Sequence, residues 1–540
     1  MGAVAAAAGA AYYLSQPAPS LTPTKTSPSP GLALVSVCQD STLSSYPSRD
    51  QFPYPKDRNP CYRAVESTLS ELYPDPENNP LSNIVKSGDT VAIKPNLLGP
   101  FPEDAICSHT SLLVPLLDLA VNAGASRIVV CEGPAIGGEN DEMFKEGFSN
   151  IANLVAHLQK AYAGAEISWL NLNKDSFTWL DLGSSSELRP IYPDKELFSE
   201  GYEPFRPGPG KLIEDSYYRF EDSSGHNPGG FRAGLYAISN AILESDVLIN
   251  VPKIKTHCIA GVTLSLKNLI GITISDTGRG KKSNQDPLKD VPHFSTPPPH
   301  WGPNEELSME DSYDSDVLWR VVADLNKAVL YSDKHGTIRQ GKQRKYLSVV
   351  DGIIGMEWNG PVNGTPKPTG VVVAGCDPVA VDAVCCRIMG YDYATLRIVK
   401  KLSDLSDHPI GTCDPSKICV VGESLDKVNF SSVFKPHNNY TDSKIAPHSL
   451  SLPRFDPPNA ISISVTAMPD KVETNVSATI DNPQEVRSAW LRYGNGPERR
   501  IVGMELVGGE VSCSIPLLHD TVMLELVDRY LNTKWYDVEF

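Results

Sequence analysis

The sequence predicts an α/β domain, with a mostly parallel sheet and helices on both faces, followed by a small all-β sandwich of immunoglobulin or fibronectin type. Two observations lead to this prediction. Up to about Gly422, apolar runs of strand length alternate with segments of helical periodicity, an order typical of parallel sheets whose crossovers are helices. After Pro453, apolar and polar residues alternate singly between turn signals, as in half-buried antiparallel strands. The expected domains are residues 31–452 and 459–540.

The elements of the larger domain follow from these patterns. The expected strands are Leu34–Cys38, Thr90–Lys94, Arg127–Cys131, Val247–Val251, Leu347–Asp351, Gly370–Gly375 and Ile418–Val421. The expected helices are Cys61–Tyr73, Ser111–Ala123, Ile151–Ala163, Val317–Tyr331 and Pro378–Met389. Residues 172–234 and 272–316 are rich in Gly, Pro, Ser and Asp, so we expect lids or binding loops there. A solvated basic loop is the alternative for Arg279–Lys282.

The two ends of the chain differ from this domain. Residues 459–540 contain no concentrated polar chemistry, which favours an accessory or adhesion module with a protein or polysaccharide partner. Residues 1–30 comprise an apolar, alanine-rich segment and a Pro/Ser-rich linker, similar to the remnant of a signal peptide or anchor. The apolar segment is too short to span a bilayer, and no basic residue precedes Lys25. Export or a cell-envelope location, and a disordered leader on a cytoplasmic protein, both remain open.

Composition narrows the classes of ligand. The chain has 540 residues and a formal net charge of −17, so nucleic acid and anionic membrane surfaces are unsuitable as general partners. Its 11 cysteines include no C-x-x-C pair, so no iron–sulfur cluster is expected. A basic site must therefore be local, and it suits a small anionic ligand.

Polar chemistry is concentrated between Asp246 and Gly271. Val247–Val251 predicts a strand that Pro252 ends, and Thr263–Ile270 predicts a helix packed against it. Between or within these elements lie Lys253, Lys255, Thr256, His257, Lys267 and Asn268. Ligands bind at this edge of an open α/β sheet, where lysines favour an anion. The plainer interpretation is a set of surface lysines with a histidine bonded to a loop carbonyl.

Polar residues also follow other strands at their carboxyl ends. Lys94 and Asn96 end one strand, and Glu132 ends the next. Asp351 precedes a glycine-rich turn that contains Asn359 and Gly360. Because these strand ends share one edge of a parallel sheet, we expect their side chains to converge on one cleft. Purely structural roles are the alternative: an N-cap for Asp377 before Pro378, a cap neighbour for His109, and turns for the glycines.

Four sequence strings together resemble the domain-of-unknown-function family 362. They are Lys94-Pro95-Asn96, Asn250 to His257 with Lys267-Asn268 and Gly271, Asp351 to Pro361, and Asp377 to Asp382. The resemblance covers about Leu32 to Gly422. It implies a polar cleft, a bacterial or archaeal source, frequent export through a twin-arginine signal, and frequent description as an iron–sulfur protein. The cysteines of this chain do not support the cluster.

A more distant similarity concerns the nickel-pincer lactate racemase group. His257, Gly261 and Lys267 are spaced as in that group, where an H-x-x-x-G segment precedes the lysine that holds the cofactor covalently. The group has a histidine where this chain has Glu132. The similarity therefore implies a related fold and cleft, without lactate racemisation.

The expected function is an enzyme acting on a small anionic metabolite, a carboxylate or phosphate, with isomerase- or lyase-type proton transfer. We assign catalysis to His257, Lys267 and Glu132, and substrate binding to Lys94, Asn96, Lys253, Lys255, Thr256, Asn268, Asn359 and Gly360. A divalent metal would find candidate ligands in Asp351, Asp377, Asp382, His293 and His300. The alternative is a non-catalytic exported anion-binding protein with a C-terminal adhesion module.

Overall fold

The structure is a computed structural model. It describes residues 32–74, 79–99, 101, 104–134, 144, 150–162, 164–187, 234–273, 318–425, 427–428, 434–438, 460–468, 473–494, 500–516 and 522–539. The predictions for residues 1–30, for Arg279–Lys282 and for His293 and His300 lie outside these residues.

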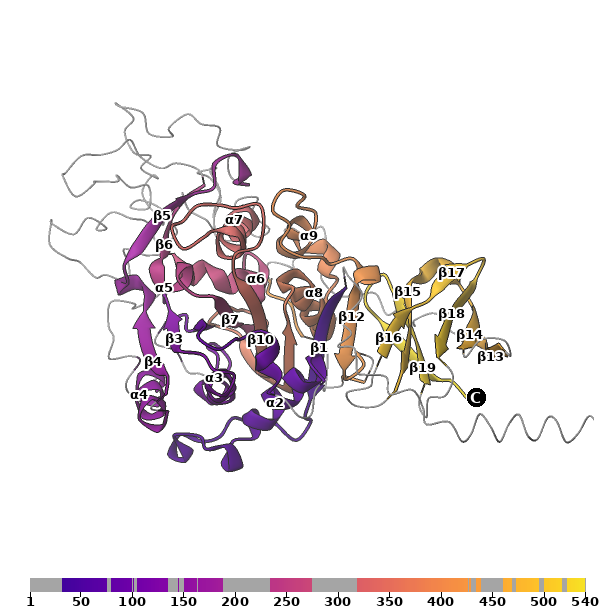
Figure 1. The fold of residues 1–540 in the computed structure, drawn as a ribbon, viewed down its shortest axis with the longest axis horizontal. Helices are drawn as coiled ribbons and strands as arrows, with labels where there is room; N and C mark the ends of the chain where they lie inside the picture. The colour runs from indigo at the N-terminus through magenta and orange to yellow at the C-terminus, as the bar shows by residue number, and fades with distance from the viewer. Residues whose placement is uncertain are drawn as a thin grey trace, which may run out of the picture. The chain divides into compact units, whose positions relative to one another are not determined.

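A ten-stranded mixed sheet forms the centre of the larger domain (Figure 1). Its strand order is β12-β1-β11-β10-β7-β2-β3-β4, and β8 and β9 extend it beside β10. The strands are β1 Ala33–Gln39, β2 Thr90–Pro95, β3 Arg127–Glu132, β4 Glu166–Asn171, β7 Val247–Val251, β8 Lys253–His257, β9 Gly261–Thr263, β10 Lys345–Glu357, β11 Thr365–Gly375 and β12 Ile418–Gly422.

All the strands predicted for this domain are present, but the sheet is less parallel than expected. β11 runs antiparallel to both β10 and β1. The physical reason is the short connection between β10 and β11, because a turn of a few residues joins only antiparallel neighbours. The prediction also missed β4, and β5 (Phe177–Asp181), which lies inside a stretch expected to be loop and pairs with β6 (Leu235–Ser239).

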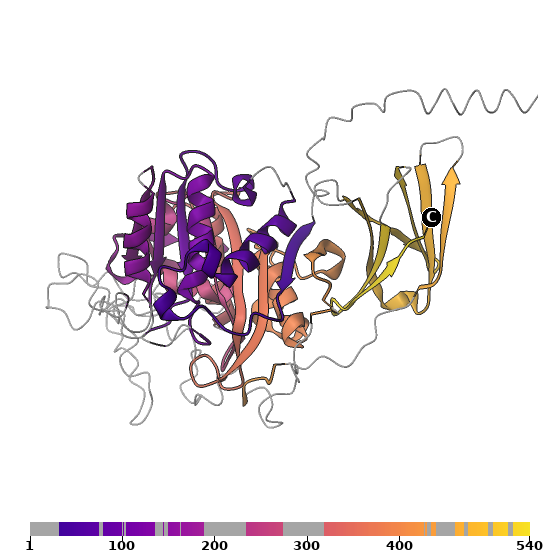
Figure 2. The same cartoon turned by 90° about the horizontal axis from the view of Figure 1, so that it is seen from below.

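Helices cover both faces of the sheet. They are α2 Pro60–Leu72, α3 Leu113–Asn122, α4 Ile151–Ala161, α5 Asn240–Leu243, α6 Ser265–Asn268, α7 Leu318–Tyr331, α8 Pro378–Met389 and α9 Arg397–Ser403. Helices α2 to α4 lie on one face of the sheet (Figure 2). They share one apolar core with alternate strand residues such as Val91, Ile93, Val247 and Ile249. The residues between them, including Ala92 and Leu248, are buried on the opposite face. Helix α8 packs on β1, β10 and β11, and α6 packs on β7 and on α8.

The C-terminal part consists of two four-stranded antiparallel sheets, in the orders β13-β14-β18-β17 and β16-β15-β19-β20. Residues of both sheets form one apolar core, separate from that of the larger domain. The strands are β13 Ala460–Met468, β14 Glu473–Ile480, β15 Val486–Tyr493, β16 Arg500–Gly503, β17 Glu505–Val507, β18 Glu510–Pro516, β19 Val522–Asp528 and β20 Thr533–Asp537. No helix in the described part of the chain has the length and apolar character needed to cross a membrane.

Candidate functional site

Strand β8 places its lysines by simple alternation. It continues after Pro252 and pairs with β10, with Lys253 opposite Asp351 and Lys255 opposite Met356. Ile254 points to the other side, where a side chain on Gly352 would meet its Cδ1 at 2.6 Å. Both lysines therefore turn toward the carboxyl ends of the neighbouring strands, as the sequence predicted.

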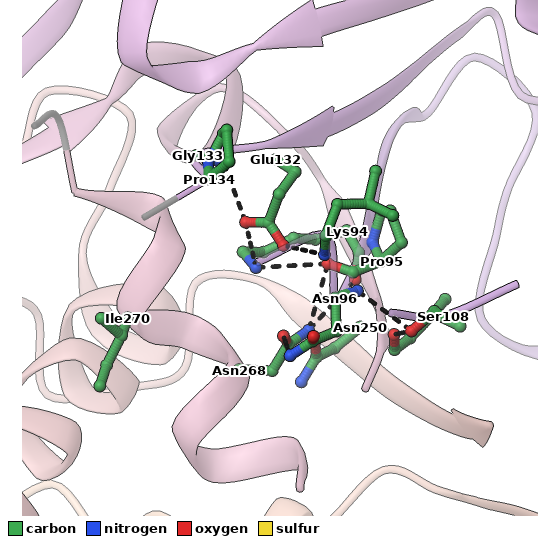
Figure 3. A network of polar contacts seen from close by, with 12 residues as sticks. Lys94, Pro95, Asn96, Ser108, Glu132, Gly133, Pro134, Asn250, Asn268 and Ile270 are labelled. Carbon is green, nitrogen blue, oxygen red and sulfur yellow. Dashed lines mark hydrogen bonds and ion pairs between the residues drawn. The ribbon is translucent and has the colours of Figure 1, made fainter. Parts of the chain in front are cut away.

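Lys94 and Glu132 form a buried ion pair at the ends of β2 and β3 (Figure 3). Lys94 Nζ lies 2.6 Å from Glu132 Oε1. The Glu132 carboxylate also accepts hydrogen bonds from the main-chain N–H groups of Gly133 (2.8 Å) and Leu97 (3.0 Å). Burial raises the pKa of Glu132, and the Lys94 charge opposes that rise. Glu132 is thus fully engaged as a partner of Lys94.

Asn96, Asn268 and Asn250 lie beside this pair (Figure 3), and Asn268 Nδ2 donates to the main-chain carbonyl of Lys94 (3.4 Å). Lys255 Nζ donates to Asn96 Oδ1 (3.2 Å), and Asn96 Nδ2 donates to Asn268 Oδ1 (2.9 Å). Asn268 Nδ2 donates to Asn250 Oδ1 (2.7 Å), and Asn250 Nδ2 donates to the Ser265 carbonyl (2.8 Å). Each amide thereby fixes the orientation of the next, from β8 through the end of β2 to α6.

Lys253 belongs to a second pair. Its Nζ lies 3.0 Å from Asp351 Oδ2 and also donates to the hydroxyl of Tyr46. Tyr46 donates to Asp351 Oδ1 (2.7 Å) and stacks on His109 with ring centroids 4.2 Å apart. Asp351 Oδ2 additionally accepts the main-chain N–H of His109 (2.9 Å). Asp351 is therefore the counter-ion of Lys253.

Lys255 and Lys267 have no such counter-ion. Within the described residues, no carboxylate lies within salt-bridge distance of either side chain, whereas Lys94 and Lys253 each have one. Burial lowers the pKa of Lys255 to about 7, with the neighbouring Lys267 and Lys253 acting in the same direction. Burial, together with Lys94, also lowers the pKa of Lys267 to about 8. The cluster of these four lysines thus carries more positive than negative charge.

Asp382 fixes the segment that carries Lys267. Its carboxylate, on α8, accepts the N–H groups of Ser265 (2.8 Å) and Leu266 (3.0 Å) at the start of α6. The predicted helix began at Thr263, which is wrong, because Gly261–Thr263 forms β9 and pairs with β8. Lys267 is partly exposed, in contrast to the buried Lys94, Lys253 and Lys255.

The remaining predicted residues lie at the end of β8 and in the turn after β10. His257 Nδ1 accepts the N–H groups of Ile259 (3.0 Å) and Ala260 (3.2 Å), which leaves the ring proton of the neutral form on Nε2. Thr256 Oγ1 donates to the Trp358 carbonyl (2.8 Å). A side chain on Gly360 would lie 2.0 Å from the Thr256 carbonyl oxygen, so only glycine permits this approach. Asn359 Oδ1 is buried and accepts no hydrogen bond from the described residues.

Three of the candidate metal ligands, Asp351, Asp377 and Asp382, lie within the described residues, and each has other partners. Asp377 caps α8 by accepting the N–H groups of Val379 (3.0 Å) and Ala380 (2.9 Å). Asp351 and Asp382 have the partners given above. The described residues contain no group of three His, Cys, Asp or Glu side chains that could hold a metal ion. In the structure Asp351 serves as a counter-ion, and Asp377 and Asp382 accept N–H groups at the starts of helices.

Sequence reasoning missed Tyr46 and the Ile106 carbonyl, which accepts a hydrogen bond from Lys255 Nζ (2.6 Å). Tyr46 lies in a polar segment of no evident pattern, 305 positions away from Asp351. Asn250 was visible within the polar segment, but its bond to Asn268 depends on how α6 packs on β7. No sequence pattern predicts either contact.

Comparison with known proteins agrees with the resemblance found in the sequence. Residues 209–387 match the family model described as Domain of unknown function (DUF362). This segment contains β7 to β9, α6, β10, β11 and most of α8, and therefore Lys253, Lys255, His257, Lys267 and Asp351.

One curated relative is a thylakoid-associated protein of Synechocystis sp., 27% identical over 176 residues, which are 31% of this chain and 42% of that protein. Among solved structures, the lactate racemase apoprotein from Thermoanaerobacterium thermosaccharolyticum matches with a TM-score of 0.28 and 14% identity. The match covers 61% of this chain and 55% of that one. A Thermotoga maritima protein also gives a TM-score of 0.28, at 9% identity, covering 59% and 56% of the two chains.

Proposed function

We propose that this protein is an enzyme that binds a small anionic metabolite, a carboxylate or phosphate, beside Lys255 and Lys267. The main support for the proposal is the excess of positive charge in the cluster of Lys94, Lys253, Lys255 and Lys267. Lys94 and Lys253 are neutralised by Glu132 and Asp351, but Lys255 and Lys267 are not neutralised within the described residues. A buried charge without a partner costs several kcal/mol, so an anionic ligand is the natural counter-ion.

The other residues have supporting roles in this proposal. The asparagine chain orients Lys255, and Asp382 orients the segment of Lys267. His257 is the proposed proton-transfer group, acting through Nε2 because its Nδ1 accepts main-chain N–H groups. Glu132, proposed as catalytic from the sequence, acts instead through Lys94 as a positioning residue.

The experiment is calorimetric titration with oxalate, which carries two negative charges and no reactive carbonyl carbon. We expect Lys255→Met and Lys267→Met each to weaken oxalate binding by roughly tenfold, about 1.4 kcal/mol. Lys334→Met removes an exposed lysine and is the matched control. Equal oxalate affinity in all four proteins, or no binding by the wild type, would overturn the proposal.

A non-catalytic anion-binding protein is the second candidate, and the presence of the two C-terminal sheets favours it, since they offer a docking module. The thylakoid association in the name of the Synechocystis relative supports an envelope setting for either candidate. His257→Gln separates the two: turnover of a substrate would be lost with anion affinity retained in an enzyme, whereas a binding protein has no turnover to lose.

A further inference from the structure

The hydrogen bonds of Lys255 match a neutral amine better than an ammonium ion. A neutral amine has two N–H groups and a lone pair, whereas an ammonium has three N–H groups. Lys255 Nζ finds two acceptors in the described residues, the Ile106 carbonyl at 2.6 Å and Asn96 Oδ1 at 3.2 Å. The side chain is only 1% exposed, so water does not replace a missing third acceptor. The lone pair of the neutral form is left unused.

The contrast with Lys253 shows that this arrangement is specific to Lys255. Lys253 is equally buried and burial lowers its pKa as well, but its Nζ faces Asp351 at 3.0 Å, and this carboxylate opposes the shift by favouring the charged amine. The acceptors of Lys255 are an amide and a peptide carbonyl, both uncharged. Asn96 is itself oriented by Asn268, so its oxygen stays directed at Lys255.

We propose that Lys255 forms an imine with the carbonyl group of a 2-oxo acid whose carboxylate is held by Lys267. The inference deepens the proposed function and rests on it, since it names the class of anion. Because the pKa of Lys255 is about 7, neutral pH provides both the charged form that attracts the anion and the neutral form that attacks its carbonyl group, while Lys267, with a pKa of about 8, stays mostly charged. A cationic neighbour that keeps a buried lysine neutral is a known means of activating the amine.

Imine formation between Lys255 and the 2-oxo acid needs no further reagent. The Lys255 lone pair attacks the carbonyl carbon, the C=O π pair moves to oxygen, and one proton passes from nitrogen to that oxygen to give a carbinolamine. The hydroxyl then leaves as water, after taking a proton from the charged Lys267, while the nitrogen lone pair forms the C=N bond. The iminium loses its remaining N–H proton to Lys267, which restores the donor. Overall, amine and carbonyl give imine and water.

The test is trapping with glyoxylate, the smallest 2-oxo acid, and sodium cyanoborohydride, which reduces an imine to a stable secondary amine. The full-length protein is labelled at neutral pH, and peptide mapping by mass spectrometry follows Lys255 and the exposed Lys334. We expect Lys255 to be labelled at least tenfold faster than Lys334, with a rate that rises through about pH 7 and falls above about pH 8.

Two controls make each outcome decisive. Lys267→Met should slow the labelling of Lys255, and oxalate should protect Lys255 but not Lys334. Labelling of Lys255 at or below the rate of Lys334 overturns the imine. If oxalate still binds under those conditions, the anion site stands and only the imine is wrong; if oxalate does not bind, the proposed function fails as well.

Discussion

Lys94 Nζ and Glu132 Oε1 lie 2.6 Å apart, and each side chain is at most 4% exposed. The pair joins the carboxyl ends of two adjacent parallel strands, β2 and β3. A buried pair of this kind contributes little net stability compared with an apolar pair, but losing one partner leaves the other charge uncompensated. Lys94 is therefore neutralised in place, and the excess charge of the cluster falls on Lys255 and Lys267.

Glu132→Gln should lower the free energy of unfolding by about 3 kcal/mol, because Lys94 stays buried without a counter-ion. The Lys94→Met/Glu132→Gln double variant should recover most of this loss. Urea unfolding at pH 7 measures both effects. Lys345→Met breaks an exposed pair with Asp89 and should change stability by less than about 1 kcal/mol. Equal losses in the single and double variants would show that the pair is not coupled.

Gly271→Ala should disrupt the same pair by steric contact. A Cβ at position 271 would lie 2.2 Å from Glu132 Oε1 and 3.1 Å from Lys94 Nζ. We expect destabilisation of about 2–4 kcal/mol, within the range for overpacked buried sites. Gly341→Ala is the control, since nothing lies within 4 Å of a Cβ there. Matching thermal midpoints for the two variants would contradict the close packing of Gly271 on the ion pair.

Much of this arrangement was predictable from the sequence, and the limits have physical causes. Apolar runs and the Lys253/Lys255 alternation depend on local periodicity, so the strands and the shared direction of these lysines were predicted correctly. The helix expected from Thr263 is present but begins at Ser265, because Gly261, with a φ of 77°, turns the chain back so that Gly261–Thr263 pairs with β8. Which carboxylate neutralises which lysine depends on contacts between distant segments, so the pairing of Asp351 with Lys253 was not predicted.

The pH dependence of stability should report the burial of Lys255. Its pKa is lowered from 10.5 to about 7 in the folded protein. Below pH 7 the Lys255 amine is charged in both the folded and the unfolded protein, so the folded state bears the full free-energy cost of burying that charge. As the pH rises from about 7 toward 10.5, the unfolded chain binds more protons than the folded one, so stability rises. Lys255→Met should therefore be more stable than wild type at about pH 6, by a few kcal/mol, and this advantage should shrink by about pH 9.

Urea unfolding of Lys255→Met and Lys334→Met across this pH range tests the point. The exposed Lys334 should give a constant difference from wild type. A constant difference for Lys255→Met as well would mean that Lys255 titrates like a surface lysine.

The C-terminal sheets are proposed to be an independent accessory module. Their apolar core contains only residues between positions 460 and 538, while Arg492 donates to the Val420 carbonyl, Ser488 to the Pro415 carbonyl and Tyr393 to the Arg529 carbonyl. A chain ending at residue 453 should be soluble and folded, with a modest loss of stability from the hydrogen bonds that are removed. Differential scanning calorimetry of the truncated protein measures this, and aggregation with loss of its heat transition would argue against an accessory role.

If Lys255 and Lys267 supply the charge for a small anion, the affinity for oxalate should fall as these two lysines lose their protons. Oxalate keeps both negative charges over this range, whereas the two lysines lose their protons at about pH 7 and about pH 8. We predict that the dissociation constant of oxalate rises by on the order of tenfold or more between about pH 6 and about pH 9. The Lys255→Met/Lys267→Met double variant should bind oxalate weakly, with a dissociation constant that does not depend on pH in this range. An affinity that stays constant across the range, or that is the same in the double variant, would contradict the account.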